Sequence, residues 1–115
     1  MNYWTKKFVE LNKKYWNGQL SIINVNVVDL TKENADGMYY YPHEDNPARI
    51  ELDRNIAHHH KVNALLHEMC HHAVNELYDY TPYHFHGKEW KREMVRCGFK
   101  GKIHARRGLL KIKNL

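Results

Sequence analysis

The sequence contains few cysteines and no long apolar run. Two cysteines, Cys70 and Cys97, are too few for a disulfide framework or for a four-cysteine zinc ribbon, so we expect reduced thiols. The longest uninterrupted apolar run has four residues, Met38 to Tyr41, which is far too short to cross a membrane. Charged residues also occupy the N-terminal region where a signal peptide has its apolar stretch. We therefore expect an intracellular protein that does not contact a membrane.

Length and charge narrow the class of protein further. A chain of 115 residues with 43% hydrophobic residues is long enough for one domain with its own core and too short for two ordinary ones. The net charge of +5 is unevenly distributed, because residues 1–86 hold 8 basic and 11 acidic side chains, whereas residues 87–115 hold 10 basic and 2 acidic ones. Such a basic C-terminal quarter suits a polyanionic partner. The alternative is a solvated basic tail that only aids solubility.

Hydrophobic periodicity predicts helices and strands in the first half of the chain. Apolar residues recur at intervals of four, three and four from Trp4 to Tyr15, which predicts a helix over about residues 2–16. Segments rich in β-branched or aromatic residues, or alternating between apolar and polar, predict three short strands at residues 20–28, 38–41 and 48–53. In the third strand we expect alternate residues to be buried (Ala48, Ile50, Leu52) and to face solvent (Arg49, Glu51, Asp53).

The second half of the chain is predicted to be mainly helical. A broad apolar stripe predicts a long helix over about residues 58–78. Pro82 makes a continuous helix impossible at residues 79–85, which we interpret as a loop, and a last helix follows at about residues 87–96. The stretch 103–115 is interpreted as a terminal strand or an ordered tail. The predicted fold class is therefore α+β, with helices and a small three-stranded sheet in a single domain.

The long predicted helix contains the sequence His67-Glu68-Met69-Cys70-His71, an H-E-x-x-H motif. Two histidines four residues apart lie one turn apart on the same helix face, so both imidazoles can bind one metal ion. Zinc suits this arrangement, because a catalytic zinc site needs three protein ligands and leaves its fourth position to water. Glu68 is then placed to take the proton of that water as general base. The motif predicts hydrolysis of peptide bonds by a metalloenzyme with one Zn²⁺ ion.

Chance and surface histidines are the alternative explanation of this motif. A shuffled sequence with this histidine-rich composition would contain the pattern with a probability of about 6%. The position of the motif in the middle of an amphipathic helix, after the apolar pair Leu65-Leu66, favours the metal site.

The third metal ligand decides the class of metallopeptidase. A metzincin needs glycine and histidine where this chain has Val74 and Leu77, so that class is excluded. We prefer His86 as the third ligand, because an imidazole at the start of the predicted last helix can be aimed back at the helix that carries the motif. The weaker candidates are glutamates of that next helix and two further histidines: Glu89, Glu93, His72 and His84.

These residues resemble a known family. The run Leu65 to His71, a gap of fourteen residues, and then His86-Gly87-x-Glu89-Trp90 are similar to the SprT-like metalloprotease domain, the group that includes Spartan. Upstream, an aromatic helix closing in Tyr15 to Leu20, the Ala35-Asp36-Gly37 turn and the Arg49 to Leu52 segment occur in the order usual for the family. The resemblance covers about residues 4–99.

The resemblance implies a minimal zincin-like fold with a specific ligand set. His67, His71 and His86 would be the zinc ligands and Glu68 the catalytic base. We accordingly expect a SprT-like domain over residues 1–99 and a basic C-terminal extension over residues 100–115. Spartan-like members are DNA-stimulated proteases that degrade proteins crosslinked to DNA. No pair of C-x-x-C motifs follows His86 in this sequence, so we expect a minimal version without the zinc ribbon of many relatives.

The expected partners are a protein substrate and DNA. Basic residues at spacings of three, one and four share one face of the predicted last helix. The candidate DNA-binding residues are Lys88, Lys91, Arg92, Arg96, Arg106 and Arg107. We expect a monomeric zinc endopeptidase, cytoplasmic or nucleoid-associated, that acts on DNA-associated proteins. The rivals are a DNA-binding protein with a structural zinc site and a hydrolase with a non-protein substrate.

Overall fold

The computed structural model describes residues 1–78 and 87–99. Helices and strands in this part of the chain follow the order α1 (Tyr3–Trp16), β1 (Asn24–Val28), β2 (Gly37–Tyr40), β3 (Arg49–Asp53), α2 (His58–Leu77) and α3 (Lys88–Arg96). The order confirms the predicted α+β class. The loop predicted at residues 79–85 and the strand or tail predicted at residues 103–115 lie outside the described residues.

The first helix is fixed at both ends by asparagines. Asn2 caps its N-terminus, because the Asn2 side-chain oxygen accepts a hydrogen bond from the backbone N–H of Thr5 at 2.8 Å. The amide nitrogen of the same side chain donates to the carbonyl oxygen of Val25 at 3.0 Å, which joins the helix to β1. At the other end Asn17 adopts the left-handed conformation that commonly ends a helix. The apolar face of α1 between these caps is buried in the core.

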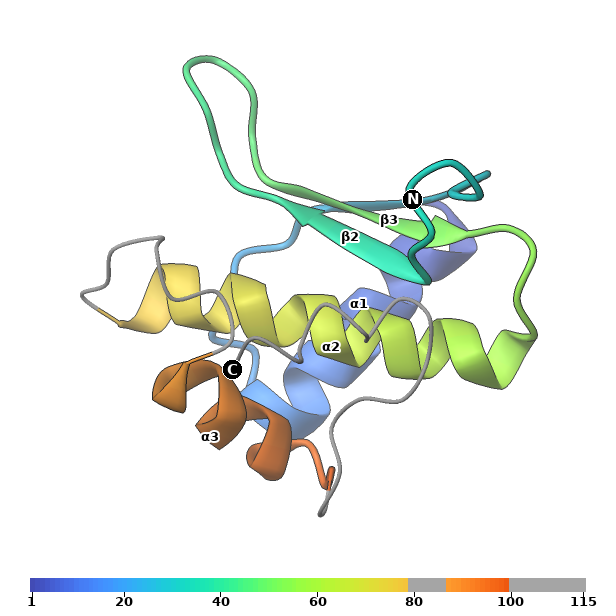
Figure 1. The fold of residues 1–115 in the computed structure, drawn as a ribbon. Coiled ribbons are helices and arrows are strands. Elements are labelled where there is room, and N and C mark those ends of the chain that lie inside the picture. The colour runs from blue at the N-terminus through green and yellow to red at the C-terminus, as the bar shows by residue number, and fades with distance from the viewer. Residues whose placement is uncertain (79–86, 100–115) are drawn as a thin grey trace.

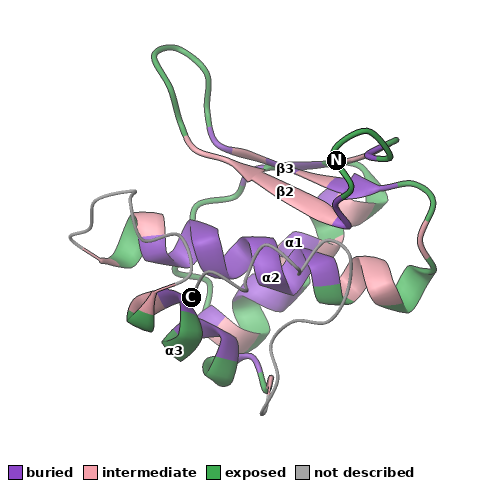
Figure 2. Ribbon diagram, viewed as in Figure 1, coloured by how far each residue is buried: buried purple, intermediate pink, exposed green. Residues whose placement is uncertain are grey.

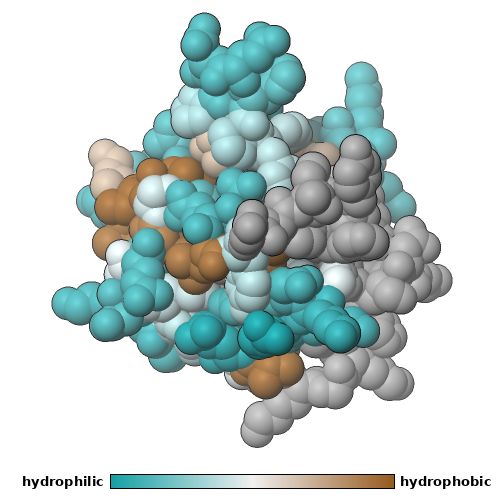
Figure 3. Space-filling model, turned by 90° about the vertical axis from the view of Figure 1, so that its left-hand side faces the viewer, coloured by the Kyte–Doolittle hydropathy of each residue, from teal (hydrophilic) through white to brown (hydrophobic). Residues whose placement is uncertain are grey.

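The three strands form one mixed sheet in the order β1-β3-β2. The central strand β3 pairs in parallel with β1 and antiparallel with β2, so β1 and β2 are the edge strands. Val25, Ile50 and Leu52 are fully buried on the face that covers the helices. A long loop between β2 and β3 extends away from the core (Figure 1) and presents hydrophilic side chains (Figure 3).

Two strand predictions need correction. The strand expected from residue 20 begins only at Asn24, because the backbone N–H and carbonyl of Leu20 bond to the side chain of Asn12 instead of a neighbouring strand. Asp53, expected to face solvent, is completely buried. Its Oδ1 accepts hydrogen bonds from the backbone N–H groups of Leu30 and Asn55, at 3.1 and 3.3 Å, which offset the cost of burying a carboxylate.

Helix α2 forms the centre of the molecule. It contacts α1, α3, β2 and β3, and the sheet lies across it while α3 packs on another side (Figure 1). Its middle is buried and its ends are exposed (Figure 2). All residues from Ala64 to Val74 are buried, which includes the whole H-E-x-x-H motif. The motif is therefore held rigidly by packing on several sides.

Among the residues that the structure describes, no helix combines the length and the apolar character that crossing a membrane requires.

Candidate metal centre

Helix α2 brings His67, Glu68 and His71 together in one buried cluster. The nitrogen and oxygen atoms that these residues offer to a metal lie within 4.8 Å of one another. The exposed fractions of the three residues are 3%, 5% and 7%. His67 Nε2 lies 3.6 Å from Glu68 Oε2. Two imidazoles with an adjacent carboxylate are a donor set that fits zinc, since imidazole nitrogen is among its favoured ligands.

Aromatic rings of two other elements hold the histidine rings in place. Trp90 of α3 is fully buried, and its ring centroid lies 4.9 Å from that of His67 and 5.6 Å from that of His71. Tyr39 of β2 lies nearly parallel to the His71 ring, with an interplanar angle of 14°. Met94 is also fully buried and belongs to the same hydrophobic core as Trp90. The prediction that Trp90 and Met94 are core residues is confirmed, and the contacts with the motif histidines are those of Trp90.

Strand β2 runs over the motif helix. A Cβ atom at Gly37 would lie 3.2 Å from Glu68 Cγ, so the strand begins directly above the glutamate. Two residues later Tyr39 reaches the next turn of α2, where it contacts His71 and His72. Residues two apart on a strand face the same side, and a step of that length matches one helical turn. The edge strand therefore lies along the motif.

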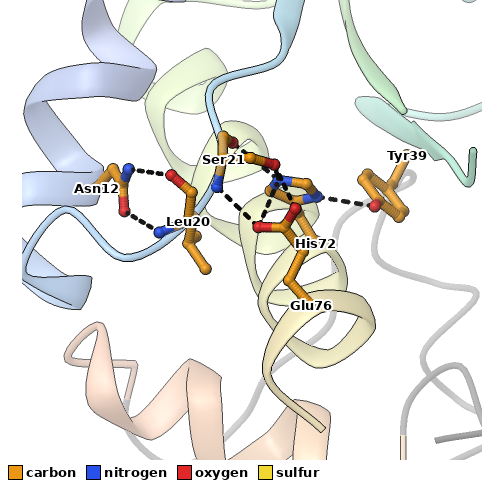
Figure 4. Close-up of polar contacts among 6 residues, drawn as sticks. All are labelled: Asn12, Leu20, Ser21, Tyr39, His72 and Glu76. Carbon is orange, nitrogen blue, oxygen red and sulfur yellow. Dashed lines mark hydrogen bonds and ion pairs between the residues drawn. The ribbon is translucent and has the colours of Figure 1, made fainter. Parts of the chain in front are cut away.

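His72, which follows His71 in the sequence, is a buried structural residue. Figure 4 shows its contacts with Ser21, Tyr39 and Glu76. Its Nε2 lies 3.0 Å from the carbonyl oxygen of Ser21, which can only accept, so Nε2 carries the hydrogen. Its Nδ1 then accepts from the Tyr39 hydroxyl at 2.8 Å. Burial lowers the pKa of His72, which keeps the ring neutral and this donor arrangement intact, although Glu76 opposes the shift from 3.4 Å.

The Tyr39 hydroxyl is committed to this contact. Burial raises the pKa of Tyr39 above its ordinary value, so the phenol remains protonated and donates to His72. The bond connects the edge strand to α2 beside the metal cluster. His72 itself does not belong to the cluster formed by the described residues, consistent with its low rank as a ligand candidate.

Glu93, another candidate for the third ligand, forms hydrogen bonds elsewhere. Its Oε1 accepts from Trp16 Nε1 at 2.7 Å and from Arg96 Nε at 2.9 Å, and its Oε2 accepts from the Tyr78 hydroxyl at 2.7 Å. It is fully buried and joins the end of α1, the end of α2 and α3. Neither Glu93 nor Glu89 is part of the cluster that the structure describes. His86 and His84 lie outside the described residues.

The basic residues of α3 are on the surface, as the spacing predicted. Lys88, Lys91, Arg92 and Arg96 are all exposed. Arg96 is bonded to Glu93, and the Arg92 guanidinium lies 5.7 Å from the centre of the Tyr78 ring. Arg106 and Arg107 lie outside the described residues.

The two cysteines are free thiols buried in the core. The sulfur atoms of Cys70 and Cys97 are 3.9 Å apart, which connects α2 to the end of α3. Burial raises the pKa of the Cys70 thiol well above its ordinary value, and its contact with Cys97 adds to the shift. Cys70 therefore packs as a small apolar residue, as expected, and lies outside the metal cluster.

Sequence reasoning about the site missed the roles of Gly37 and Tyr39. Their contacts join β2 to α2, which lie far apart in the sequence, so no local spacing reveals them. The available signal was the glycine of Ala35-Asp36-Gly37 at the start of a predicted strand, because such glycines often mark a close backbone approach.

The fold and the cluster define a class of protein: a small α+β domain with an H-E-x-x-H motif and a candidate metal site on a buried helix. The profile of the SprT-like family matches residues 4–108, and the chain belongs to this family. It is a family of zinc metalloproteases. Comparisons with curated proteins and with solved structures returned no match.

Proposed function

We propose that this protein is a zinc-dependent endopeptidase that cleaves protein substrates. The observation that carries the proposal is the buried cluster of His67, Glu68 and His71 beneath an edge strand. A bound zinc ion would polarise the scissile carbonyl and lower the pKa of its water to about 7. His67 and His71 would hold the ion, with His86 as the proposed third ligand.

Glu68 would act as the general base. Its carboxylate lies beside the proposed ligand His67 and beneath β2. It would therefore be near an ion held by the histidines and near a peptide bound along the strand. In this role Glu68 holds the proton taken from water and later delivers it to the leaving amine. A site that only holds a structural metal has no use for such a carboxylate, because a protein ligand usually fills its fourth position.

The substrate would bind in an extended conformation along β2. Within residues 1–78 and 87–99, β3 is paired on both sides, so only β1 and β2 offer an edge, and of these β2 contacts Glu68. A peptide added to a sheet edge is held mainly by backbone hydrogen bonds. Cleavage should therefore show little sequence specificity.

We further propose that the substrates are DNA-associated or DNA-crosslinked proteins, cut by a monomeric enzyme in the cytoplasm or nucleoid. The exposed basic residues of α3 support this proposal, since a row of positive charges binds phosphates without sequence preference. The candidates in the described part are Lys88, Lys91, Arg92 and Arg96, and the proposal extends to Arg106 and Arg107.

The test is cleavage of a basic DNA-binding protein by the zinc-loaded wild type and by Glu68→Gln, each with and without single-stranded DNA. We expect cleavage by the wild type, no cleavage by Glu68→Gln, and equal zinc content in both. Glu10→Gln, an exposed glutamate of α1, is the matched control and should cleave normally.

The outcomes separate the alternatives. Glu68-dependent cleavage that requires DNA supports the complete proposal, and cleavage regardless of DNA supports a general protease. If zinc and DNA are bound and nothing is cleaved, the protein is a binding module with a structural metal.

A further inference from the structure

Gly37, the first residue of β2, lies directly over the Glu68 side chain. A methyl group at Gly37 would lie 3.2 Å from Glu68 Cγ, 3.3 Å from Glu68 Oε2 and 3.3 Å from the carbonyl oxygen of Glu51. Nonbonded carbon atoms prefer separations of about 3.5–4.0 Å, so any side chain here crowds the glutamate. Gly37 does not have the positive φ found at Gly18 and Gly98. The requirement for glycine is therefore steric.

The strand is fixed on both sides of this glycine. Immediately before Gly37, the carbonyl oxygen of Asp36 accepts a hydrogen bond from the backbone N–H of Asp53 at 2.8 Å. Two residues after it, the Tyr39 hydroxyl donates to His72 Nδ1 at 2.8 Å. Because both bonds hold the strand against its neighbours, an added methyl group would displace the glutamate and leave the strand in place.

Glu68 has little room in which to shift. Only 5% of the residue is exposed, and its Oε2 already lies 3.6 Å from His67 Nε2. The closest contact with the added methyl group would involve Cγ, so a displacement moves the whole carboxylate. A general base must remain within hydrogen-bond reach of its proton. The contact requires the glutamate to give by a few tenths of an ångström. Since a misplacement of about 1 Å can lower a rate roughly 100-fold, this smaller shift should lower it by less.

We propose that Gly37 is a positioning residue for Glu68: the missing side chain at the start of the edge strand determines where the carboxylate lies beneath it. This inference deepens the proposed function and rests on it, because Glu68 is the general base only if the protein is a hydrolase. The steric part of the inference stands on the contact alone.

A double-mutant cycle on the metal-free protein tests the contact without any enzyme assay. Gly37→Ala should lower the Tm by roughly 5 °C. In the Glu68→Ala background, which lacks Cγ and the carboxylate, the same substitution should lower the Tm much less. An equal loss in both backgrounds would overturn the proposal, because it would place the cost in the strand itself.

Gly18→Ala is the matched control. Gly18 has a φ of 76° and no atom within 4 Å of an added Cβ, so its substitution costs backbone strain alone. Its effect on the Tm should be the same in the wild-type and Glu68→Ala backgrounds.

Kinetics of the zinc-loaded protein test the positioning role. Gly37→Ala should lower kcat roughly 3- to 10-fold while KM and zinc content stay unchanged, and Gly18→Ala should preserve kcat. If the wild type cleaves and Gly37→Ala keeps its full kcat, Gly37 does not position the base and the proposed function stands. If the wild type does not cleave, the proposed function fails, and the Tm cycle alone decides whether Gly37 places the carboxylate.

Discussion

Glu93 is the carboxylate on which three elements of the fold converge. It accepts hydrogen bonds from Trp16, Tyr78 and Arg96 while being fully buried. A buried carboxylate is costly unless hydrogen-bond donors satisfy its oxygens. Here all three contacts are short charge-assisted hydrogen bonds, at 2.7, 2.7 and 2.9 Å. The strength of this arrangement depends on the negative charge, because all three partners donate.

Replacing that charge tests the arrangement. Glu93→Gln should lower the free energy of unfolding by roughly 2 to 4 kcal/mol, because the amide nitrogen must face a donor. The matched control is Glu10→Gln, which removes an exposed ion pair between Lys7 and Glu10. These two residues are three apart, as are Glu93 and Arg96. The control should lower the free energy of unfolding by less than about 0.5 kcal/mol. Urea unfolding measures both, and equal losses would contradict the prediction.

The hydrogen bond from the Tyr39 hydroxyl to His72 can also be tested. Tyr39→Phe keeps the ring against His71 but leaves His72 Nδ1 without its donor, which should cost about 1–2 kcal/mol in the free energy of unfolding. Tyr40→Phe is the control, because its hydroxyl bonds to Glu51 at the more exposed side of the sheet and should cost less. Chemical denaturation of the two variants compares them, and a larger loss for Tyr40→Phe would refute the assignment.

At the scale of single residues, sequence reasoning found the groups that act locally and missed those that act across the fold. His67 and His71 could be paired because four residues make one helical turn. The burial of Asp53 and the contact between Gly37 and Glu68 could not be predicted, because each depends on how distant segments pack. The polar residues of an alternating strand are expected to face solvent. Asp53 is an exception because a backbone N–H group from another part of the fold bonds to its carboxylate.

At the scale of helices and strands, an element's end could be predicted where local sequence determines it and not where distant partners do. The C-terminal end of α1 was predictable, since the apolar periodicity stops at an asparagine–glycine pair. The start of β1 was not, because β-branched residues continue upstream to Ile22 while the backbone of Leu20 is bonded to Asn12. Composition identifies which segments can form a strand, and the available hydrogen-bond partners determine where pairing begins.

Helix α3 presents two kinds of basic residue. Arg96 and Arg92 contact Glu93 and Tyr78, so substituting them would disturb the fold as well as the surface. Lys88 and Lys91 are exposed. The two lysines are therefore the residues with which DNA binding should be tested.

The double substitution Lys88→Ala/Lys91→Ala should weaken binding to single-stranded DNA and flatten its salt dependence by about 0.7 per lost phosphate contact in a log–log plot. Stability should change by less than about 0.5 kcal/mol. Lys6→Ala/Lys32→Ala removes the same charge from other exposed positions and serves as the control. Titrations at several salt concentrations measure the slope, and an equal effect in the control would mean that net charge alone determines binding.

At the scale of the whole molecule, the candidate metal site and the core share one helix. The residues of α2 from Ala64 to Val74 are buried against α1, α3 and two strands, and the cluster lies within this stretch. A ligand that binds only the folded state stabilises the entire cooperative unit to which its site belongs. Metal binding should therefore affect global unfolding as well as the local order of the site.

Zinc should accordingly raise the Tm of the metal-free protein, and a chelator should reverse the change. Free zinc at 100 times its Kd contributes about 2.7 kcal/mol to stability. Glu68→Gln should keep this gain, because Glu68 is the proposed base and not a ligand, whereas His71→Ala should lose it. His59→Ala, an exposed histidine at the start of α2, is the control and should behave as wild type.

Comparing the unfolding transitions recorded by two probes distinguishes a site that is coupled to the whole core from one that orders only its surroundings. Because Trp90 contacts both histidine rings and Trp16 bonds to Glu93 of the same helix α3, tryptophan fluorescence reports on the packing between the helices. When zinc is added, the unfolding midpoint measured by helical circular dichroism and the midpoint measured by this fluorescence should rise by the same amount. Fluorescence that shifts with zinc while the helical signal does not would show that the ion orders only its surroundings, and α2 would not couple the site to the core.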